Sequence, residues 1–221
     1  MSAKYPRSFH LPWSPGGTSD DKRLKDVSAL VGAEIVITEK CDGSNLTYTR
    51  TSVFSRSHSG PPGHPSFNLA KATHARIAHM LSEGISVFCE YCYAVHSIAY
   101  EALPDYSLVF GVRDDVEGTW WDWDMTAAQA ADLGLPTVPV LFRGAVSSEE
   151  ELRALTEKLS RGPSAFGGAR EGVVVRRAGQ FADGDFSRSL GKWVRRDHVQ
   201  TDEHWMHQSI VAQKLSGTGR S

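Results

Sequence analysis

The 221-residue sequence lacks the long uninterrupted apolar run that a membrane span requires. Residues 1–13 also lack a basic region followed by an apolar stretch, so we expect no signal peptide. Cysteine is scarce: Cys41, Cys89 and Cys92 are odd in number, which argues against the paired framework of a small secreted protein and favours a reducing compartment. We therefore expect a soluble cytoplasmic protein with no membrane association.

The sequence also lacks an excess of positive charge. It has 24 Lys and Arg residues against 26 Asp and Glu residues, which gives a formal net charge of −2 at pH 7. This balance argues against a protein that holds nucleic acid through its overall charge, but it leaves room for a local basic strip containing Lys192, Arg195 and Arg196. A hydrophobic content of 40% is enough for a core and excludes a disordered or fibrous protein.

The order of predicted elements indicates a single α+β domain. The first thirty residues are rich in Pro, Gly, Ser and Asp, which predicts a loop-rich lead-in over 1–33 to which we assign no chemistry. The domain itself is expected over 34–200, with a tail over 201–221. Ser148 and Glu151 form a capping box at a helix start. We expect strands over 85–91, 106–112, 137–142, 172–176 and 190–195, and helices over 67–83, 126–133 and 148–160.

One predicted turn contains a lysine that could act as a nucleophile. Ile35 and Ile37, and then Leu46 and Tyr48, alternate with other residues on either side of Lys40–Gly43, which predicts two strands joined by a tight turn. The turn has the form Lys-x-Asp-Gly. An ordinary lysine, with a pKa of ~10.4, is an ammonium ion and cannot attack, but burial and neighbouring cations lower that pKa and yield a nucleophile. In isolation the motif is more typical of a hairpin turn with an exposed lysine.

Further segments follow this motif in a fixed order. They are Glu39–Asn45 around the turn itself, Ser55–Ser57, Val87–Glu90, Leu108–Phe110, Glu171–Val175 and Lys192–Arg195. Together they resemble the motifs of the covalent nucleotidyltransferase superfamily of ligases and capping enzymes, and in particular the RNA ligases related to the phage T4 RNA ligase 2 type. The resemblance implies one nucleotidyltransferase domain of the ATP-grasp-like ligase adenylylation type, with antiparallel sheets flanked by helices.

The resemblance also implies roles for residues near the turn. Lys40 would be the catalytic nucleophile that attacks the α-phosphorus of ATP and forms lysyl-AMP. Glu39 would accept a hydrogen bond from adenine or another ligand group, and Asn45 would orient a phosphate or a metal-bound water. Arg56 would contact phosphate with its planar donor fork. Taken singly, an Asn or Arg here is more often a turn or surface residue.

The later segments supply the rest of the implied nucleotide site. Glu90 would accept hydrogen bonds from the ribose hydroxyls, and Phe110 would stack on adenine. Glu171 would bind Mg²⁺, and Lys192 would neutralise charge on the α-phosphate. Without the other motifs, Glu90 also fits a solvated strand end and Phe110 ordinary core packing.

Two positions depart from the family pattern. Gly111 stands where the family often has an Asp directly after the aromatic residue, so the role of that Asp is either lost or supplied elsewhere, for example by Asp114 or Asp115. Val194 stands where a second lysine is usual, and Arg195 is expected to substitute for it imperfectly.

The length of the sequence after the last motif favours one branch of this superfamily. DNA ligases and capping enzymes usually carry a five-stranded oligonucleotide-binding barrel after the last motif, and the segment after Lys192 is too short for one. The resemblance therefore implies a monomeric ATP-dependent RNA ligase that uses ATP and Mg²⁺ to seal RNA ends or a nicked RNA duplex, beside an end-healing kinase or phosphatase. A DNA ligase or other polynucleotide adenylyltransferase, and a non-catalytic module that binds nucleic-acid ends, remain open alternatives.

Two clusters of metal-ligand residue types are weaker signals. Cys89 and Cys92 have the spacing of a zinc or redox pair, but a zinc site needs further ligands and a redox pair belongs at a helix start rather than on a strand. His198, His204 and His207 are expected in a solvated or RNA-facing tail helix.

Overall fold

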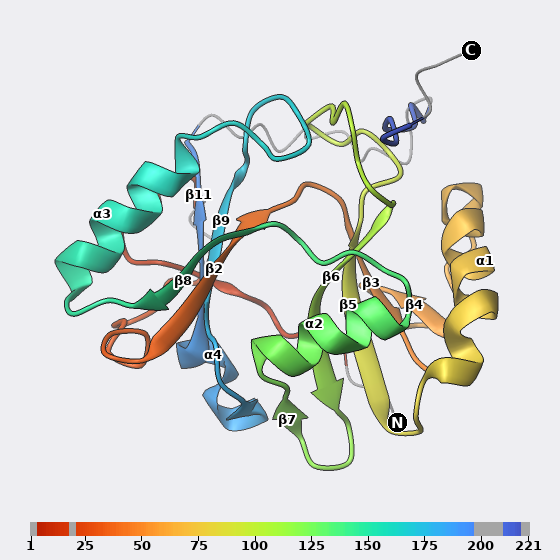
Figure 1. The fold of residues 1–221 in the computed structure, drawn as a ribbon, viewed down its shortest axis with the longest axis horizontal. Coiled ribbons are helices and arrows are strands. Elements are labelled where there is room, and N and C mark those ends of the chain that lie inside the picture. The colour runs from red at the N-terminus through yellow and green to blue at the C-terminus, as the bar shows by residue number, and fades with distance from the viewer. Residues whose placement is uncertain (1–3, 18–20, 197–209, 218–221) are drawn as a thin grey trace.

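The strands of the computed structural model, which describes residues 4–17, 21–196 and 210–217, form two sheets (Figure 1). The first sheet has the order β1 (Phe9–His10), β11 (Leu190–Val194), β9 (Gly172–Arg177), β2 (Glu34–Lys40) and β8 (Val140–Ala145). The second has the order β10 (Phe181–Ala182), β7 (Thr119–Trp120), β6 (Ser107–Asp114), β5 (Ile85–Tyr91), β3 (Ser44–Tyr48) and β4 (Val53–Ser55). Neighbouring strands are antiparallel except β1 and β11.

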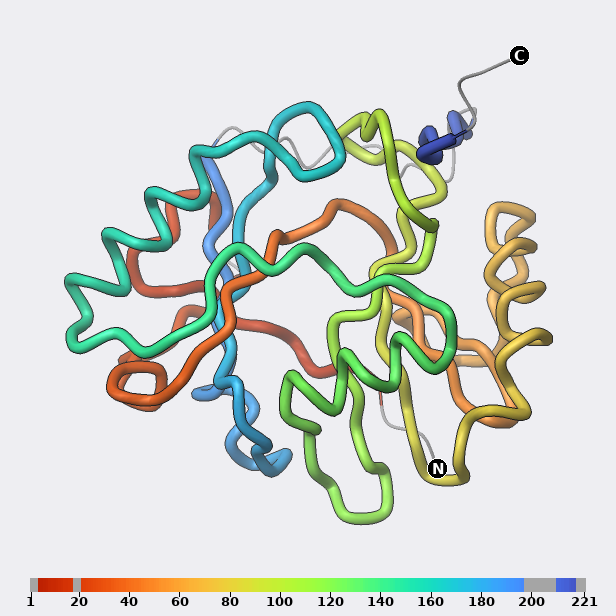
Figure 2. Tube along the Cα trace, in the orientation of Figure 1, coloured from red at the N-terminus to blue at the C-terminus, as the bar shows by residue number. Residues whose placement is uncertain are grey.

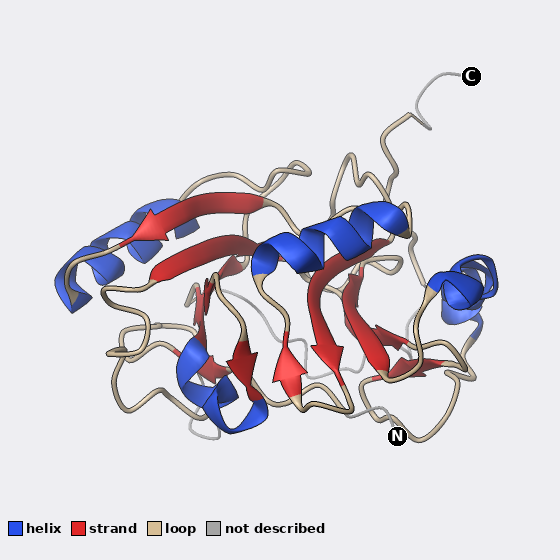
Figure 3. Cartoon of the chain, turned by 60° about the horizontal axis from the view of Figure 1, so that its bottom comes forward, coloured by secondary structure: helices blue, strands red, loops and turns tan. Residues whose placement is uncertain are grey.

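Helices flank both sheets (Figure 3). Helix α3 packs on β9 and β11 of the first sheet, and α2 and α1 pack on β6 and β4 of the second. The predicted α+β class, with antiparallel sheets flanked by helices, is confirmed. The bounds are α1 (Asn68–Ile77), α2 (Trp123–Asp132), α3 (Glu149–Ser160) and α4 (Phe186–Ser189), with 3₁₀ turns at Pro65–Phe67, Ala78–Met80 and Asp183–Asp185.

Strand alternation divides each sheet into a face against its helices and a face against the other sheet. Successive side chains on a strand point to opposite faces. On β9, Val173 and Val175 lie in the core beneath α3, whereas Val174 packs in a cluster shared with the second sheet. The same alternation points other side chains, several of them polar, into the space between the two sheets. The residues facing inward in this way are Thr38, Lys40, Phe88, Glu90, Val174, Arg176, Leu190 and Lys192.

The strands flanking Lys40–Gly43 do not pair with each other. Strand β2 pairs with β8 and β9, whereas β3 pairs with β4 and β5 in the other sheet. Ile35 is buried in the core of the first sheet, and Leu46 is buried beneath α1 and α2. The predicted turn therefore exists, but the hairpin interpretation is wrong, because the two apolar faces serve different cores.

Two element boundaries differ from the prediction for local reasons. Helix α2 begins at Trp123, three residues before the expected start at Thr126, because the Asp122 carboxylate caps it by accepting from the Met125 amide at 2.7 Å. The strand expected over 137–142 is β8, at Val140–Ala145. The preceding residues hydrogen-bond to both sheets instead of extending the strand: the Val138 amide donates to Val109 and the Pro139 carbonyl accepts from Glu39.

Helix α3 begins as predicted. Its N-cap, Ser148, accepts a hydrogen bond from the Glu151 amide at 3.2 Å. The carboxylate of Glu151 accepts in turn from the amide and hydroxyl of Ser147, both at 2.7 Å, one residue earlier than in a standard capping box.

Segments outside the central strands pack into the same unit. Strand β1, within the predicted lead-in, pairs with β11, and Leu11, Leu24 and Leu30 are buried in the core of the first sheet. At the other end, residues 210–217 lie against the loop that follows β5, as the dark blue part of the trace shows in Figure 2. Among the described helices, none has the length and apolarity to cross a membrane.

Candidate active site

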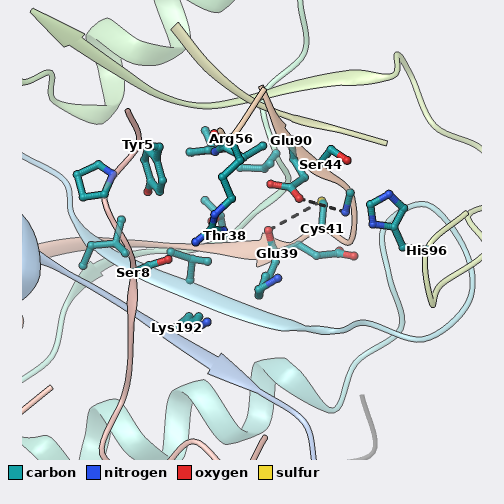
Figure 4. Close-up of a pocket in the computed structure, with 18 of the residues that line it drawn as sticks. Tyr5, Ser8, Thr38, Glu39, Cys41, Ser44, Arg56, Glu90, His96 and Lys192 are labelled. Carbon is teal, nitrogen blue, oxygen red and sulfur yellow. Dashed lines mark hydrogen bonds between the residues drawn. The ribbon is translucent and has the colours of Figure 1, made fainter. Parts of the chain in front are cut away.

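A cavity of about 570 Å³ lies between the inner faces of the two sheets (Figure 4). That volume is within the range of small-molecule sites. The cavity is walled by β2, β9 and β11 on one side and by β3, β4, β5 and β6 on the other, with Tyr5 and Ser8 of the N-terminal segment at the end opposite His96. Every predicted site residue except Glu171 lines it: Glu39, Lys40, Asn45, Arg56, Glu90, Phe110 and Lys192.

Lys40 and Glu171 form a close ion pair at one wall. Lys40 is the last residue of β2 and lies opposite Gly172, the first residue of β9, so Glu171 directly precedes its partner strand. The Lys40 Nζ lies 2.7 Å from the Glu171 carboxylate, which is 3% exposed. Glu171 therefore lies behind Lys40 rather than on the cavity wall.

The pKa of Lys40 differs from the expectation. Burial lowers this pKa, but the carboxylates of Glu171 and Glu90 and the hydrogen bond to Glu171 outweigh burial and raise it above its usual value. The predicted lowering is therefore wrong for this structure, since carboxylates rather than cations dominate around the amine. The effect on Lys192 has the opposite sign: burial and the nearby Lys40 lower the pKa of Lys192.

Glu90 connects the turn to the second sheet. Burial raises its pKa to about 7, although Lys40 opposes the shift. Its Oε1 accepts a hydrogen bond from the Gly43 amide at 3.1 Å, and Asn45 lies opposite it on β3. A side chain at Gly43 would place its first carbon 2.7 Å from the Tyr91 carbonyl oxygen, so only glycine lets the turn pass this close to β5.

Asp42, the carboxylate of the Lys-x-Asp-Gly motif, points away from the cavity and fixes the turn. Its Oδ2 accepts from the amide and hydroxyl of Ser97, both at 2.8 Å, and from the Ile98 amide at 2.9 Å. Its own amide donates to the Tyr100 hydroxyl at 2.8 Å. Burial alone would raise the pKa of Asp42, but the hydrogen bonds from Ser97 hold it below its usual value.

Glu39 has one carboxylate oxygen engaged with the protein and one without a partner. Its Oε2 accepts from the Ala165 amide at 2.9 Å and lies 3.3 Å from the Arg170 Nε. Its Oε1 is buried and has no hydrogen-bond partner among the described residues. A buried acceptor of this kind is costly unless a ligand donor satisfies it.

Lys192 faces the cavity from β11 and belongs to a charged cluster that the sequence analysis missed. Its Nζ lies 3.9 Å from the carboxylate of Asp21, which also lies 3.2 Å from Arg7 and 3.5 Å from the His10 imidazole. Burial, with Lys192 nearby, lowers the pKa of His10 to about 4. Arg7, His10 and Asp21 come from the lead-in, where no local pattern marks them as functional.

Aromatic side chains close the other end of the cavity. The ring of Tyr5, also from the lead-in, meets the ring of Phe110 edge to face with centroids 5.0 Å apart. Phe88 and Phe186 surround the same tyrosine with centroids 5.2 and 5.4 Å away. Tyr5 thereby supports the ring predicted to stack on a base, a role that the sequence analysis did not assign.

The two expected substitutions for family residues are not made. Asp114 accepts from the amides of Val116 and Glu117 in the turn after β6, and Asp115 is ion-paired with Arg113. Both lie off the cavity wall, because β6 runs away from it after Phe110, so the proposed replacement for an Asp at position 111 is wrong. Likewise Arg195, after the end of β11, does not line the cavity and does not replace the second lysine.

The donor groups fit a metal held jointly with phosphate rather than by protein alone. Among the described residues, no three His, Cys, Asp or Glu side chains gather to hold a metal ion. Mg²⁺ usually takes one or two carboxylates and completes its shell with phosphate oxygens and water. Glu171, 2.7 Å from the Lys40 amine, is the carboxylate predicted to serve in this way.

The weaker metal signals from the sequence remain outside the site. Cys89 and Cys92 are buried free thiols, and burial raises the pKa of each well above its usual value. His198, His204 and His207 lie outside the described residues.

Comparisons with known proteins give consistent results. A sequence model of the RNA ligase family matches residues 33–194. Three similar solved structures are of Naegleria gruberi RNA ligase: a variant with ATP and Mn (TM-score 0.57, 15% identity), the protein with PPi (0.54, 17%) and a variant with AMP and Mn (0.54, 14%). Each match covers 76% of this chain and 51% of the other, so this chain spans about half their length, and at this identity the likeness shows the fold alone. No curated protein matched the chain.

Proposed function

The chain belongs to the RNA ligase family, and on that premise we propose that it is an ATP-dependent RNA ligase that takes AMP onto Lys40. The observation that carries the proposal is the convergence on one cavity of a lysine from β2 with acceptors and cations from both sheets. The similar solved structures with ATP, AMP and Mn support a nucleotide and a divalent metal as ligands of this fold.

In the first step the Lys40 Nζ attacks the α-phosphorus of ATP. A nitrogen–phosphorus bond forms, the bond to pyrophosphate breaks, and pyrophosphate leaves with its electron pair. Lys40 must first give up a proton to water and separate from Glu171, because an ammonium ion paired at 2.7 Å has no free electron pair. The pair holds the amine ready at the end of β2 without letting it react.

Neighbouring side chains bind the nucleotide around that amine. Glu39 Oε1, which lacks a partner among the described residues, would accept from the adenine amine, and Phe110 would stack on the base. Glu90, at the end of β5, would accept from ribose hydroxyls.

Cationic and amide side chains bind the phosphates. Arg56 on the exposed rim and Lys192 on β11 would neutralise phosphate charge as the bond to pyrophosphate breaks, and Asn45 would orient a phosphate oxygen. Glu171, once released from Lys40, would hold Mg²⁺, which when bound supplies positive charge to the phosphates and opposes the ammonium form of Lys40.

The next steps move AMP and then release it. An RNA 5′-phosphate attacks the lysyl-AMP phosphorus, the nitrogen–phosphorus bond breaks to free the Lys40 amine, and a pyrophosphate-linked end forms. A 3′-hydroxyl then attacks the RNA 5′-phosphorus of that end, gives its proton to water and joins the strands as AMP leaves. We propose that the substrates are RNA ends or a nicked RNA duplex. We further propose that the protein is a monomer, that it acts in the reducing cytoplasm, and that it works beside an end-healing kinase or phosphatase.

Incubation with α-labelled ATP and Mg²⁺ tests the proposal. We expect covalent label on the wild-type chain and none on Lys40→Ala, while Lys158→Ala, which changes a helix α3 lysine outside the cavity, keeps full label. Absence of label on the wild-type chain would overturn the ligase assignment in favour of a non-catalytic end-binding module. Equal label on Lys40→Ala would overturn it by showing that Lys40 is not the nucleophile.

Substrate selectivity is tested separately. Sealing is compared on nicked all-RNA, RNA on DNA and all-DNA duplexes. We expect the all-RNA nick to be sealed at least as fast as the mixed duplex and faster than all-DNA. Preferential sealing of all-DNA would identify a DNA ligase.

A further inference from the structure

The C-terminal segment 210–217 packs beside the catalytic turn through an intervening loop. Ala212 forms a β-bridge with Ala94, and Leu215 forms a β-bridge with Leu103. The segment therefore pairs with both the beginning and the end of the loop between β5 and β6. Figure 2 shows the segment, in dark blue, next to that loop. The proposed three-step reaction assigns no role to this contact.

Gln213 adds side-chain hydrogen bonds to the backbone hydrogen bonds that Val211, Lys214 and Ser216 make with the same loop. Its side chain is 4% exposed. Its Oε1 accepts from the Tyr100 amide at 2.7 Å, and its Nε2 donates to the Ile98 carbonyl at 2.7 Å. Its backbone amide donates to the Tyr93 carbonyl at 2.8 Å. One amide side chain therefore satisfies two buried backbone groups that would otherwise lack partners.

The residues that Gln213 holds are the same residues that hold Asp42. Ile98 donates its amide to the Asp42 carboxylate, and Tyr100 accepts the Asp42 amide through its hydroxyl. Asp42 lies two residues after Lys40 in the turn between the sheets. A continuous path of hydrogen bonds thus runs from the C-terminal segment to the turn that carries the nucleophile.

We propose that Gln213 is a positioning residue for the Lys40 nucleophile, acting through the loop 97–100 and Asp42. This inference rests on the proposed function, because it concerns the rate at which Lys40 is adenylylated. Nucleophilic attack requires the reacting atoms to be held in near-attack geometry, and small displacements of a supporting residue lower the rate strongly. Among the described residues, Gln213 hydrogen-bonds to none that lines the cavity, so its effect falls on alignment rather than on nucleotide contacts.

A single-turnover measurement of lysyl-AMP formation tests this role. Gln213→Leu removes both side-chain hydrogen bonds at similar volume, and we expect the rate constant at saturating ATP to fall about 10-fold, while the ATP Kd, measured in a Lys40→Ala background, changes less than about 2-fold. The matched control is Lys214→Ala, which alters an exposed side chain in the same segment and keeps the wild-type rate.

A double-mutant cycle separates positioning from loss of stability. In an Asp42→Asn background, Gln213→Leu should lower the rate by less than about 2-fold, because its effect passes through the contact already weakened. If Gln213→Leu does not fold, Gln213→Glu is used instead, because it keeps the acceptor and loses the donor. Its rate constant should lie between that of the wild-type chain and that of the Asp42→Asn variant.

The outcomes distinguish this inference from the proposed function. A wild-type chain that takes no label contradicts the ligase assignment. A wild-type chain that takes label, together with a Gln213 variant that reacts at the wild-type rate or loses rate by the same factor with and without Asp42, overturns only the positioning role.

Discussion

The guanidinium of Arg176, on β9, donates a hydrogen bond to the backbone carbonyl of Phe110, on β6, at 3.1 Å. The same group donates to the Trp121 carbonyl at 2.8 Å and lies 5.6 Å from the ring centroids of Trp123 and Phe181. Arg176 is 3% exposed, and its burial lowers its pKa to about 10. One side chain of the first sheet therefore holds the strand of the second sheet that carries the proposed adenine-stacking ring.

Arg176→Lys is expected to weaken both the fold and nucleotide binding. A lysine cannot reproduce the planar fork that serves both carbonyls, and unpaired buried carbonyls destabilise the fold. We predict a loss of about 2–4 kcal/mol in the free energy of unfolding by urea, and a higher KM for ATP. The neighbouring Arg177→Lys, whose side chain points to the other face, should lose less than about 0.5 kcal/mol. Equal losses in the two variants would contradict the bridging role.

Glu39 should set the preference for adenine. Its buried Oε1 would accept from the amine of adenine but would face the carbonyl of guanine, so a carboxylate rejects GTP. Glu39→Gln offers a donor as well, and we predict at least about a 10-fold fall in the ratio of ATP to GTP used in labelling. An unchanged ratio would show that Glu39 serves only its contact with Arg170.

Phe110 should contribute stacking energy to nucleotide binding. Removal of a ring that stacks on a base costs about 1–3 kcal/mol, which corresponds to a Kd for ATP raised roughly 5- to 150-fold. The measurement is calorimetric titration of Phe110→Ala in the Lys40→Ala background, so that no chemistry interferes. Phe54→Ala, on β4 outside the cavity wall, is the matched control. The idea fails if the two variants bind ATP alike.

His10 should make the stability of the fold fall in mild acid. Its pKa is lowered to about 4 in the folded chain from the ordinary value of 6.5, so the unfolded chain binds the proton more readily. Stability is therefore lost as the pH falls from about 6.5 to about 4, by roughly 3 kcal/mol in total. His10→Gln cannot take up this proton, and wild type should lose stability relative to it across this window. Parallel pH profiles of the unfolding free energy would exclude this origin.

Local chemistry made part of the fold predictable. The cap of α3 was found where Ser148 and Glu151 predicted it, because a cap depends on residues three apart. The start of α2 lies earlier than predicted because Asp122 caps the helix. The partner of β2 was missed because pairing depends on which core buries Ile35, and that core includes residues far away in sequence.

The site was predictable in its membership but not in its electrostatics. Ordered motifs predicted seven of the residues that line the cavity, but not Tyr5, Ser8 or His96, which come from other segments. They did not predict that Glu171 would pair with Lys40 and raise its pKa. Tyr5, Arg176 and Gln213 were missed because their roles arise only from contacts across the two sheets or between the chain ends and the centre.

The passage of the chain from β2 to β3 at Lys40–Gly43 has a thermodynamic consequence. The nucleophile belongs to one sheet, whereas the residues proposed to hold the base and the ribose, Phe110 and Glu90, belong to the other. A nucleotide that spans them binds only when the sheets are docked together. By linkage, we expect the binding free energy of ATP to add to the free energy of docking the two sheets, so that bound ATP would stabilise the domain against separation of its halves.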